Sequence, residues 1–299
     1  MSLLVVGSIA FDTLETPSGR IDETLGGSGV YFSAAASYFS PSRVVAVVGR
    51  DFDNRLLDFV EKRGVDFKGV YVEDGETFRW GCKYHEDFNQ RETVFTYLNV
   101  FQNFRPNIPE EFKESKYVFL ANIDPDLQNE VLNQIKNPEF VVMDTMNFWI
   151  NGKRESVVNV LKNVNGLILN DSEARELSGE YNLIKAAKII SEMGPEMVIV
   201  KKGEHGSFLY ADDSFFFTPA YPLEEVIDPT GAGDSFAGGF MGYIVNTRSL
   251  EFSEFKKGII SGTIVASFCC ESFGIERLKY LDKDELVKRT DEFLNMINL

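Results

Sequence analysis

The chain has 299 residues, 44% of them apolar, which is enough to bury the core of one large α/β domain or of two small domains. Its formal net charge of −16 argues against nucleic acids and anionic membranes as partners, because both are bound through basic surface. A nucleotide ligand is compatible with this charge, since it needs only a local cluster of hydrogen-bond donors.

The three cysteines, Cys82, Cys269 and Cys270, form neither a metal-spaced set nor an even-numbered disulfide framework. They are typical of small buried apolar side chains in a reducing compartment. The sequence opens on the apolar run 3–6 without a charged leader, and no apolar run approaches the roughly 20 residues that span a bilayer. We therefore expect a cytoplasmic protein.

Apolar runs of β type alternate with helical patterns through most of the chain. Strands that are apolar on both faces and separated by helices are typical of a parallel sheet covered on both sides. We predict one domain over 1–299, an α/β fold with a doubly wound, mainly parallel sheet and helices on both faces. The predicted strands cover 3–7, 43–48, 116–121, 139–144, 166–170 and 196–201, and the predicted helices lie near 29–39, 53–63, 126–136, 153–163 and 182–193.

One region breaks this alternation of strands and helices. Polar and apolar side chains alternate from Thr77 to Tyr84, and a second extended piece covers 92–98. Such strands have one polar face and fit poorly into a sheet that is covered on both sides. We predict a separate small β-sheet, with strands from about 13–25 and 70–100, that acts as a lid over the substrate or as a homodimer surface.

The segment 228–236 reads Asp-Pro-Thr-Gly-Ala-Gly-Asp-Ser-Phe, and apolar residues recur at helical spacing from Phe236 onward. Its glycines therefore open a helix whose first N–H groups have no intrahelical partner and attract negative charge. Asp234 at this helix mouth suggests a base that takes a proton from a hydroxyl while the amides hold the phosphate. An acid that only complements the helix dipole is the simpler alternative.

The longer string DPTGAGDSFAGGF, residues 228–240, resembles the second signature of the PfkB family of ribokinase-like carbohydrate and nucleoside kinases. The resemblance implies a ribokinase-like fold with a β-sheet lid. It also implies that Asp234 is the catalytic base and that the amides of Gly231, Ala232 and Gly233 form the anion hole for the phosphates of ATP. Gly238, Gly239 and Gly242 indicate a helix that packs closely against another backbone.

Two segments near the amino terminus are candidates for binding the phosphoryl acceptor. Asp12 follows the first predicted strand, where an ordinary turn aspartate is the alternative. Gly26 and Gly27 resemble the first signature of the family, and the resemblance implies that Asp12, this glycine turn and Tyr31 hold the acceptor. The lysine and amide side chains of ribokinases are replaced here by Ser28, Tyr31 and Phe32, which favours a less polar or aromatic-bearing acceptor over ribose.

Asn170 and Glu173 follow the predicted strand 166–170. They fit a helix cap with an acid in the first turn. They also match the Asn-x-x-Glu motif of the family, which implies that they place Mg²⁺ through water. Asp144 and Asn147, at the end of another core strand, are weaker candidates for ordering the same site.

The turn 201–206 follows the strand 196–201 and resembles the nucleotide turn of the family. Its residues Lys201, Gly203 and Gly206 are expected at ATP, with the Lys201 side chain reaching either phosphate or solvent. His205 in this turn and His85 in the lid are expected to be exposed and not to act as bases.

The resemblance further implies that Asp228 and Thr230 help to bind a monovalent cation such as K⁺, and that the helix 253–270 walls the adenine pocket.

The sequence thus predicts an ATP- and Mg²⁺-dependent kinase that phosphorylates a hydroxymethyl group of a small sugar-like molecule. A nucleoside kinase of the adenosine type is the alternative, because Tyr31, Phe78 and Trp80 offer aromatic rings for stacking a base. A ligand-binding sensor that has lost catalysis is the alternative from another class of protein.

Overall fold

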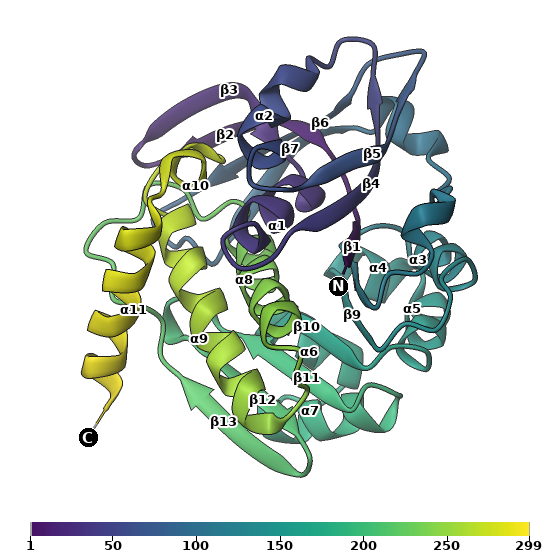
Figure 1. Ribbon diagram of the computed structural model, residues 1–299. Helices are drawn as coiled ribbons and strands as arrows, with labels where there is room; N and C mark the ends of the chain where they lie inside the picture. The colour runs from purple at the N-terminus through teal and green to yellow at the C-terminus, as the bar shows by residue number, and fades with distance from the viewer. Residues whose placement is uncertain (1, 299) are drawn as a thin grey trace.

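A nine-stranded sheet forms the centre of the computed structural model, which describes residues 2–298. Its strands are β1 (Leu3–Val6), β4 (Ser42–Gly49), β5 (Asp66–Glu73), β8 (Tyr117–Leu120), β9 (Phe140–Asp144), β10 (Gly166–Asn170), β11 (Met197–Lys201), β12 (Ser207–Ala211) and β13 (Ser214–Thr218). They lie in the order β13-β12-β11-β10-β9-β8-β1-β4-β5 (Figure 1). Neighbours from β11 to β5 run parallel, while β12 and β13 form an antiparallel edge.

Helices cover both faces of this sheet, as predicted (Figure 1). Alternate residues of β1 enter opposite cores, with Leu3 and Val5 on one side and Leu4 and Val6 on the other. Burial on both faces explains why the parallel strands are continuously apolar. One layer holds α1 (Ser28–Ala36), α8 (Ala232–Thr247), α9 (Phe252–Cys269), α10 (Glu276–Tyr280) and α11 (Lys283–Ile297); the other holds α3 (Pro125–Leu132), α4 (Asn147–Gly152), α5 (Arg154–Leu161), α6 (Asp171–Ser178) and α7 (Leu183–Glu192).

Glycines let α8 approach its two neighbours in the first layer. A side chain at Gly238 would collide with the Phe32 carbonyl of α1. Gly239 meets Gly262 of α9, with only 2.9 Å between the Gly262 Cα and the place where a Cβ at position 239 would lie. The predicted close backbone approach of this helix is therefore confirmed.

The predicted small sheet is present and lies above one end of the main sheet (Figure 1). Its strands are β2 (Ala10–Thr16), β3 (Gly19–Gly26), β6 (Phe78–Tyr84) and β7 (Arg91–Tyr97), in the order β3-β2-β6-β7. The expected lid bounds need one correction. Residues 66–73 form β5 and pair with β4 in the main sheet, because β5 continues the parallel crossover pattern of the core. The strands of the lid therefore lie within 10–26 and 78–97.

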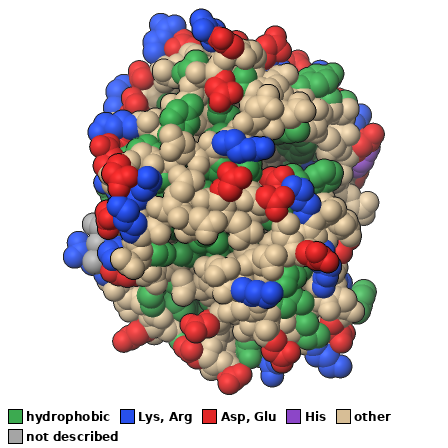
Figure 2. Space-filling model, turned by 90° about the vertical axis from the view of Figure 1, so that its right-hand side faces the viewer, with side chains coloured by type: hydrophobic (Ala, Val, Ile, Leu, Met, Phe, Trp, Pro, Cys, Tyr) green, Lys and Arg blue, Asp and Glu red, His purple; other side chains and the backbone are tan. Residues whose placement is uncertain are grey.

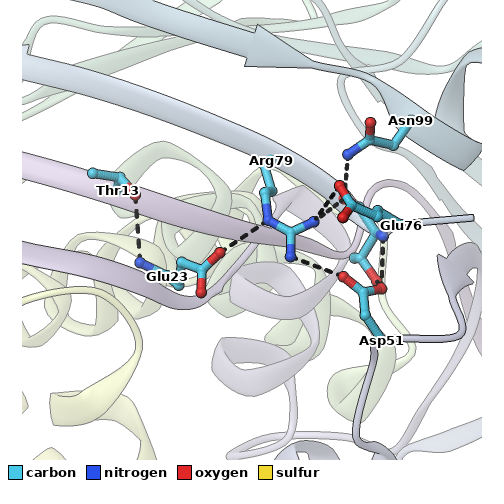
Figure 3. Close-up of polar contacts among 7 residues, drawn as sticks. Thr13, Glu23, Asp51, Glu76, Arg79 and Asn99 are labelled. Atoms are coloured by element: carbon cyan, nitrogen blue, oxygen red, sulfur yellow. Dashed lines mark hydrogen bonds and ion pairs between the residues drawn. The ribbon is translucent and has the colours of Figure 1, made fainter.

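An arginine network attaches the lid to the core (Figure 3). Arg79 of β6 donates to Asp51 at 2.9 Å and to Glu23 of β3 at 3.0 Å. The other oxygen of Asp51 accepts from the Thr77 amide at 2.8 Å and from its hydroxyl at 2.7 Å. The Asp51 carboxylate, which follows strand β4, thus holds the start of β6 against the core through Thr77 and Arg79.

Short helical segments complete the fold: the 3-10 turns 54–57, 99–103, 110–112 and 203–205, and α2 (Asp58–Glu61). The helix predicted at 53–63 is therefore a 3-10 turn followed by α2, which ends at Glu61. Gly64, with φ at +94°, lies in the turn that follows. On the face shown in Figure 2, acidic and basic side chains lie interspersed. Within residues 2–298 no helix is both long enough and apolar enough to cross a membrane.

Candidate active site

The mouth of α8 presents free backbone amides. Gly231 is its N-cap residue, with φ at +76°, and no side chain caps the helix. The Ala232 amide donates to the Pro229 carbonyl at 3.1 Å, so the turn itself uses one of the three expected donors. The amides of Gly231 and Gly233 have no acceptor within residues 2–298. These two N–H groups, reinforced by the helix dipole, can bind a phosphate.

Tyr31 of α1 supports this loop from below. A side chain at Gly231 would collide with the Tyr31 ring, which is only 1% exposed. The Tyr31 hydroxyl is buried without a hydrogen-bond partner in the described chain. The ring has no open face for a base, so the suggestion that Tyr31 stacks on the acceptor is wrong. Its ring packs against Gly231 instead.

Asp234 stands in the first turn of α8, beside three charged side chains. Burial and the Asp144 carboxylate raise its pKa to about 7, while Lys201 and Arg91 act to lower it. A general base works best when its pKa lies near the working pH, because it is then both ionised and basic enough to accept a proton. The carboxylate beside the free amides thus has the properties expected of a base for a hydroxyl group.

Asp12 is a strand residue of the lid and not a turn residue, because β2 begins at Ala10. Its side chain is 3% exposed, and burial raises its pKa to about 8, with further contributions from Asp228 and Asp234. A side chain at Gly26 would collide with the Asp12 carboxyl, and the Gly27 amide hydrogen bonds to it. The glycine turn is therefore needed for Asp12 to lie where it does.

The nucleotide turn presents Lys201 to the site and not to solvent. Its Nζ lies 3.9 Å from Asp144 Oδ2 and 2.9 Å from where a Cβ at Gly233 would be. Gly206 has φ at +80°, and a side chain there would strike the backbone of Pro219. The side chain of His205 is 75% exposed and that of His85 60%, as expected for residues outside the chemistry.

Asn170 and Glu173 form a complete capping box at the start of α6. The Glu173 amide donates to Asn170 Oδ1 at 2.9 Å, and the Asn170 amide donates to Glu173 Oε2 at 2.7 Å. Burial, followed by repulsion from Asp144, raises the pKa of Glu173 to about 7. Two buried carboxyls that repel each other would gain from a cation between them, so this pair fits a Mg²⁺ site.

Two weaker candidates separate in space. Asp144 ends β9 within the site, whereas the Asn147 amide donates to Glu176 of α6. Asp228 bridges two chain segments: its carboxylate accepts from the Thr230 amide and from the Gly274 amide, both at 2.9 Å. The Thr230 hydroxyl lies 3.4 Å from Tyr84 Oη in the lid.

Sequence reasoning missed Arg91 and Asn89, which both lie in the β6–β7 hairpin. Arg91 contributes positive charge at Asp12, Asp144, Glu173 and Asp234. The sequence signal closest to Arg91 is the predicted extended piece 92–98, and strand β7 in fact begins one residue earlier, at Arg91. The face on which Arg91 lies depends on strand register.

Comparison with known proteins decides the family. The profile of the pfkB family of carbohydrate kinases matches residues 2–276. This chain belongs to the pfkB family. It is 32% identical over 258 residues to a cytidine kinase of Thermococcus kodakarensis, a match that covers 84% of this chain and 91% of the relative.

Two solved structures show the same ribokinase-like fold. The nucleoside kinase of Methanocaldococcus jannaschii matches with a TM-score of 0.76 at 21% identity, over 97% of this chain and 98% of that one. A putative ribokinase II of E. coli in complex with ATP and Mg²⁺ matches with a TM-score of 0.79 at 16% identity, over 97% and 99%. The chain is therefore a kinase of the sugar and nucleoside class, and the sensor alternative is not retained.

Asp234→Asn should lower kcat by about 10²- to 10⁴-fold, because the amide cannot accept the hydroxyl proton, with ATP binding little changed. Steady-state ADP release and ATP-binding calorimetry measure both quantities. Asp212→Asn, in the remote β12–β13 turn, is the matched control. Near-normal turnover of Asp234→Asn would remove this residue from the role of base.

Proposed function

We propose that this pfkB kinase transfers the γ-phosphate of ATP to the ribose hydroxymethyl group of a nucleoside. The observation that carries this choice is the register of β2 and β6, in which Asp12 lies directly opposite Trp80. Residues opposite each other on neighbouring strands share one face of the sheet. An acid that can bind hydroxyls thus stands beside an indole that can stack on a base.

The other aromatic candidates do not compete with Trp80 for this role. Tyr31 is buried under Gly231, and Phe78 stacks on Phe101 with their ring centroids 5.3 Å apart. Trp80 is half-buried and packs at the edge of the cluster formed by Leu14, Cys82 and Tyr84. The cytidine kinase relative gives a pyrimidine nucleoside as the first acceptor to test.

In the proposed reaction, Asp12 and the Gly26–Gly27 turn hold the acceptor, and Asp234 takes the proton of its hydroxyl. The Gly231 and Gly233 amides hold the phosphate that the hydroxyl attacks, and Lys201 adds positive charge beside them. The β6–β7 hairpin covers the site and limits the access of water, which would otherwise be phosphorylated. Bound Mg²⁺ would neutralise phosphate charge, with Glu173 and Asp144 as the carboxyls that place it.

Two further expectations stay predictions. A monovalent cation is expected at Asp228 and Thr230. The Asp228 carboxylate already accepts a hydrogen bond from the Gly274 amide, so the cation would bind where these two segments meet. A homodimer through the lid would meet the edge strand β7, on which Val94 is 61% and Tyr97 57% exposed.

A panel of nucleosides, pentoses and hexoses with Mg·ATP should give the highest kcat/KM with a nucleoside. Trp80→Ala should then raise the KM for that nucleoside about tenfold, since base stacking on an aromatic side chain contributes roughly 1–3 kcal/mol. Trp149→Phe is the matched control, because Trp149 lies outside the site and donates to Asn122. A sugar that outperforms every nucleoside, with no effect of Trp80→Ala, would contradict the choice of acceptor.

Glu173→Gln should raise the Mg²⁺ concentration needed for half-maximal activity by about 10- to 100-fold. The amide oxygen of glutamine can still accept the Asn170 N–H, so the melting temperature should change little. A Mg²⁺ titration of the rate and a thermal melt measure these effects, with Glu176→Gln of the same helix as the control. An unchanged Mg²⁺ requirement would leave Glu173 as a helix cap only.

A further inference from the structure

Arg91 begins the outer lid strand β7, and its side chain is exposed. In the antiparallel β6–β7 pair it lies opposite Tyr84, so the two side chains leave the same face of the lid. Tyr84 is 6% exposed, and its hydroxyl lies 3.4 Å from the hydroxyl of Thr230. The face that carries Arg91 is therefore the one turned toward the segment that leads into Gly231.

The Arg91 guanidinium also lies over the acceptor side of the lid. Its central carbon is 5.2 Å from the centroid of the Trp80 ring. Trp80 pairs with Asp12 on the neighbouring strand, as described above. Arg91 is thus held by an indole face next to the proposed acceptor-binding acid, and a cation above an indole is a favourable arrangement.

The turn of the same hairpin reaches the nucleotide side of the site. A side chain at Gly203 would collide with the amide group of Asn89, which precedes Arg91 by two residues. One hairpin of the lid therefore touches the nucleotide turn through Asn89 and the anion-hole loop through Tyr84. Arg91 follows both contacts along the chain, two residues after Asn89 and in register opposite Tyr84.

Arg91 has no carboxylate within 4.0 Å among residues 2–298, although the protein is strongly acidic. The other lid arginines are paired: Arg79 with Asp51, and Arg20 with Asp22 at 2.7 Å. Even so, the charge of Arg91 lowers the pKa of acids on both sides of the site, Asp12 in the lid and Asp234 at the helix mouth. Lys201 acts on Asp234 in the same direction from the core.

We propose that Arg91 binds the transferring phosphoryl group from the lid, opposite Lys201 on the core. The acceptor oxygen forms the new bond to phosphorus, and its proton goes to Asp234. The bond from phosphorus to the β–γ bridging oxygen breaks, and ADP leaves with that electron pair. A guanidinium fork matches the oxygens of a phosphoryl group and stabilises the charge that they carry during transfer. This role rests on the kinase activity and not on the identity of the acceptor.

The test compares Arg91→Gln and Arg91→Lys with Arg20→Gln, which removes an exposed arginine elsewhere in the lid. With cytidine and Mg·ATP, Arg91→Gln should lower kcat by about 10²- to 10³-fold, while the KM for cytidine changes little. Arg91→Lys keeps the charge without the fork and should fall between this variant and the unmodified protein. Arg20→Gln should remain within about twofold of the unmodified protein, since surface ion pairs contribute little.

A second readout separates contact with phosphate from a structural role. Asp234 is influenced by the charges of Asp144, Asp12, Lys201 and Arg91. Because Arg91 lowers the pKa of Asp234, its removal should raise this pKa. The acid limb of the pH–rate profile should then move to higher pH. A kcat within threefold of the unmodified protein, a loss confined to KM, or an unshifted acid limb would overturn the proposal. Slow Mg·ATP hydrolysis without acceptor is measured on the same variants, so failure of cytidine as an acceptor is distinguished from failure of the Arg91 role.

Discussion

The site depends on one electrostatic constraint: four acids, the buried Asp12, Asp144 and Glu173 and the half-buried Asp234, are gathered near two cations, the half-buried Lys201 and the exposed Arg91. Burial is the largest cause of the raised pKa of each acid. An acid whose pKa is raised in the fold lowers the stability of the folded chain as pH rises above its unfolded value near 4. The buried acids therefore lower the stability of the fold at neutral pH. In return, the Asp234 carboxylate at the mouth of α8 can gain and lose a proton near neutral pH.

The parallel sheet is what brings these charges together. Strands β9, β10 and β11 end at the same edge, and their last residues are Asp144, Asn170 and Lys201. Ligands of open α/β sheets bind outside such carboxyl ends. The α8 mouth closes this edge from the side, because its glycines allow close packing on α1 and α9. The lid adds Asp12 and Arg91 from above, so the small sheet completes this group of charges.

Much of this arrangement could be predicted from sequence, because the decisive signals are local. The apolar runs located the core strands β1, β4, β8, β9, β10 and β11 to within about a residue, and the segment 228–236 indicated the helix mouth. The β12–β13 hairpin was not predicted, since its aromatic run Ser214–Thr218 gives no sign of an antiparallel edge. Tyr31 could not be told from a ligand contact, because a glycine at position 231 decides its burial. Arg91 needed the register of β6 and β7, which is not a local property.

The pH dependence of kcat/KM tests the central claim most directly, because it reports the ionisation of the free enzyme's base. With Asp234 as the base and its pKa raised to about 7, activity should fall as the pH drops through neutrality, since protonated Asp234 cannot accept the hydroxyl proton. The small activity that remains in Asp234→Asn should lack this acid limb. An acid limb near pH 4 in the unmodified protein, or one that persists unchanged in Asp234→Asn, would contradict the account.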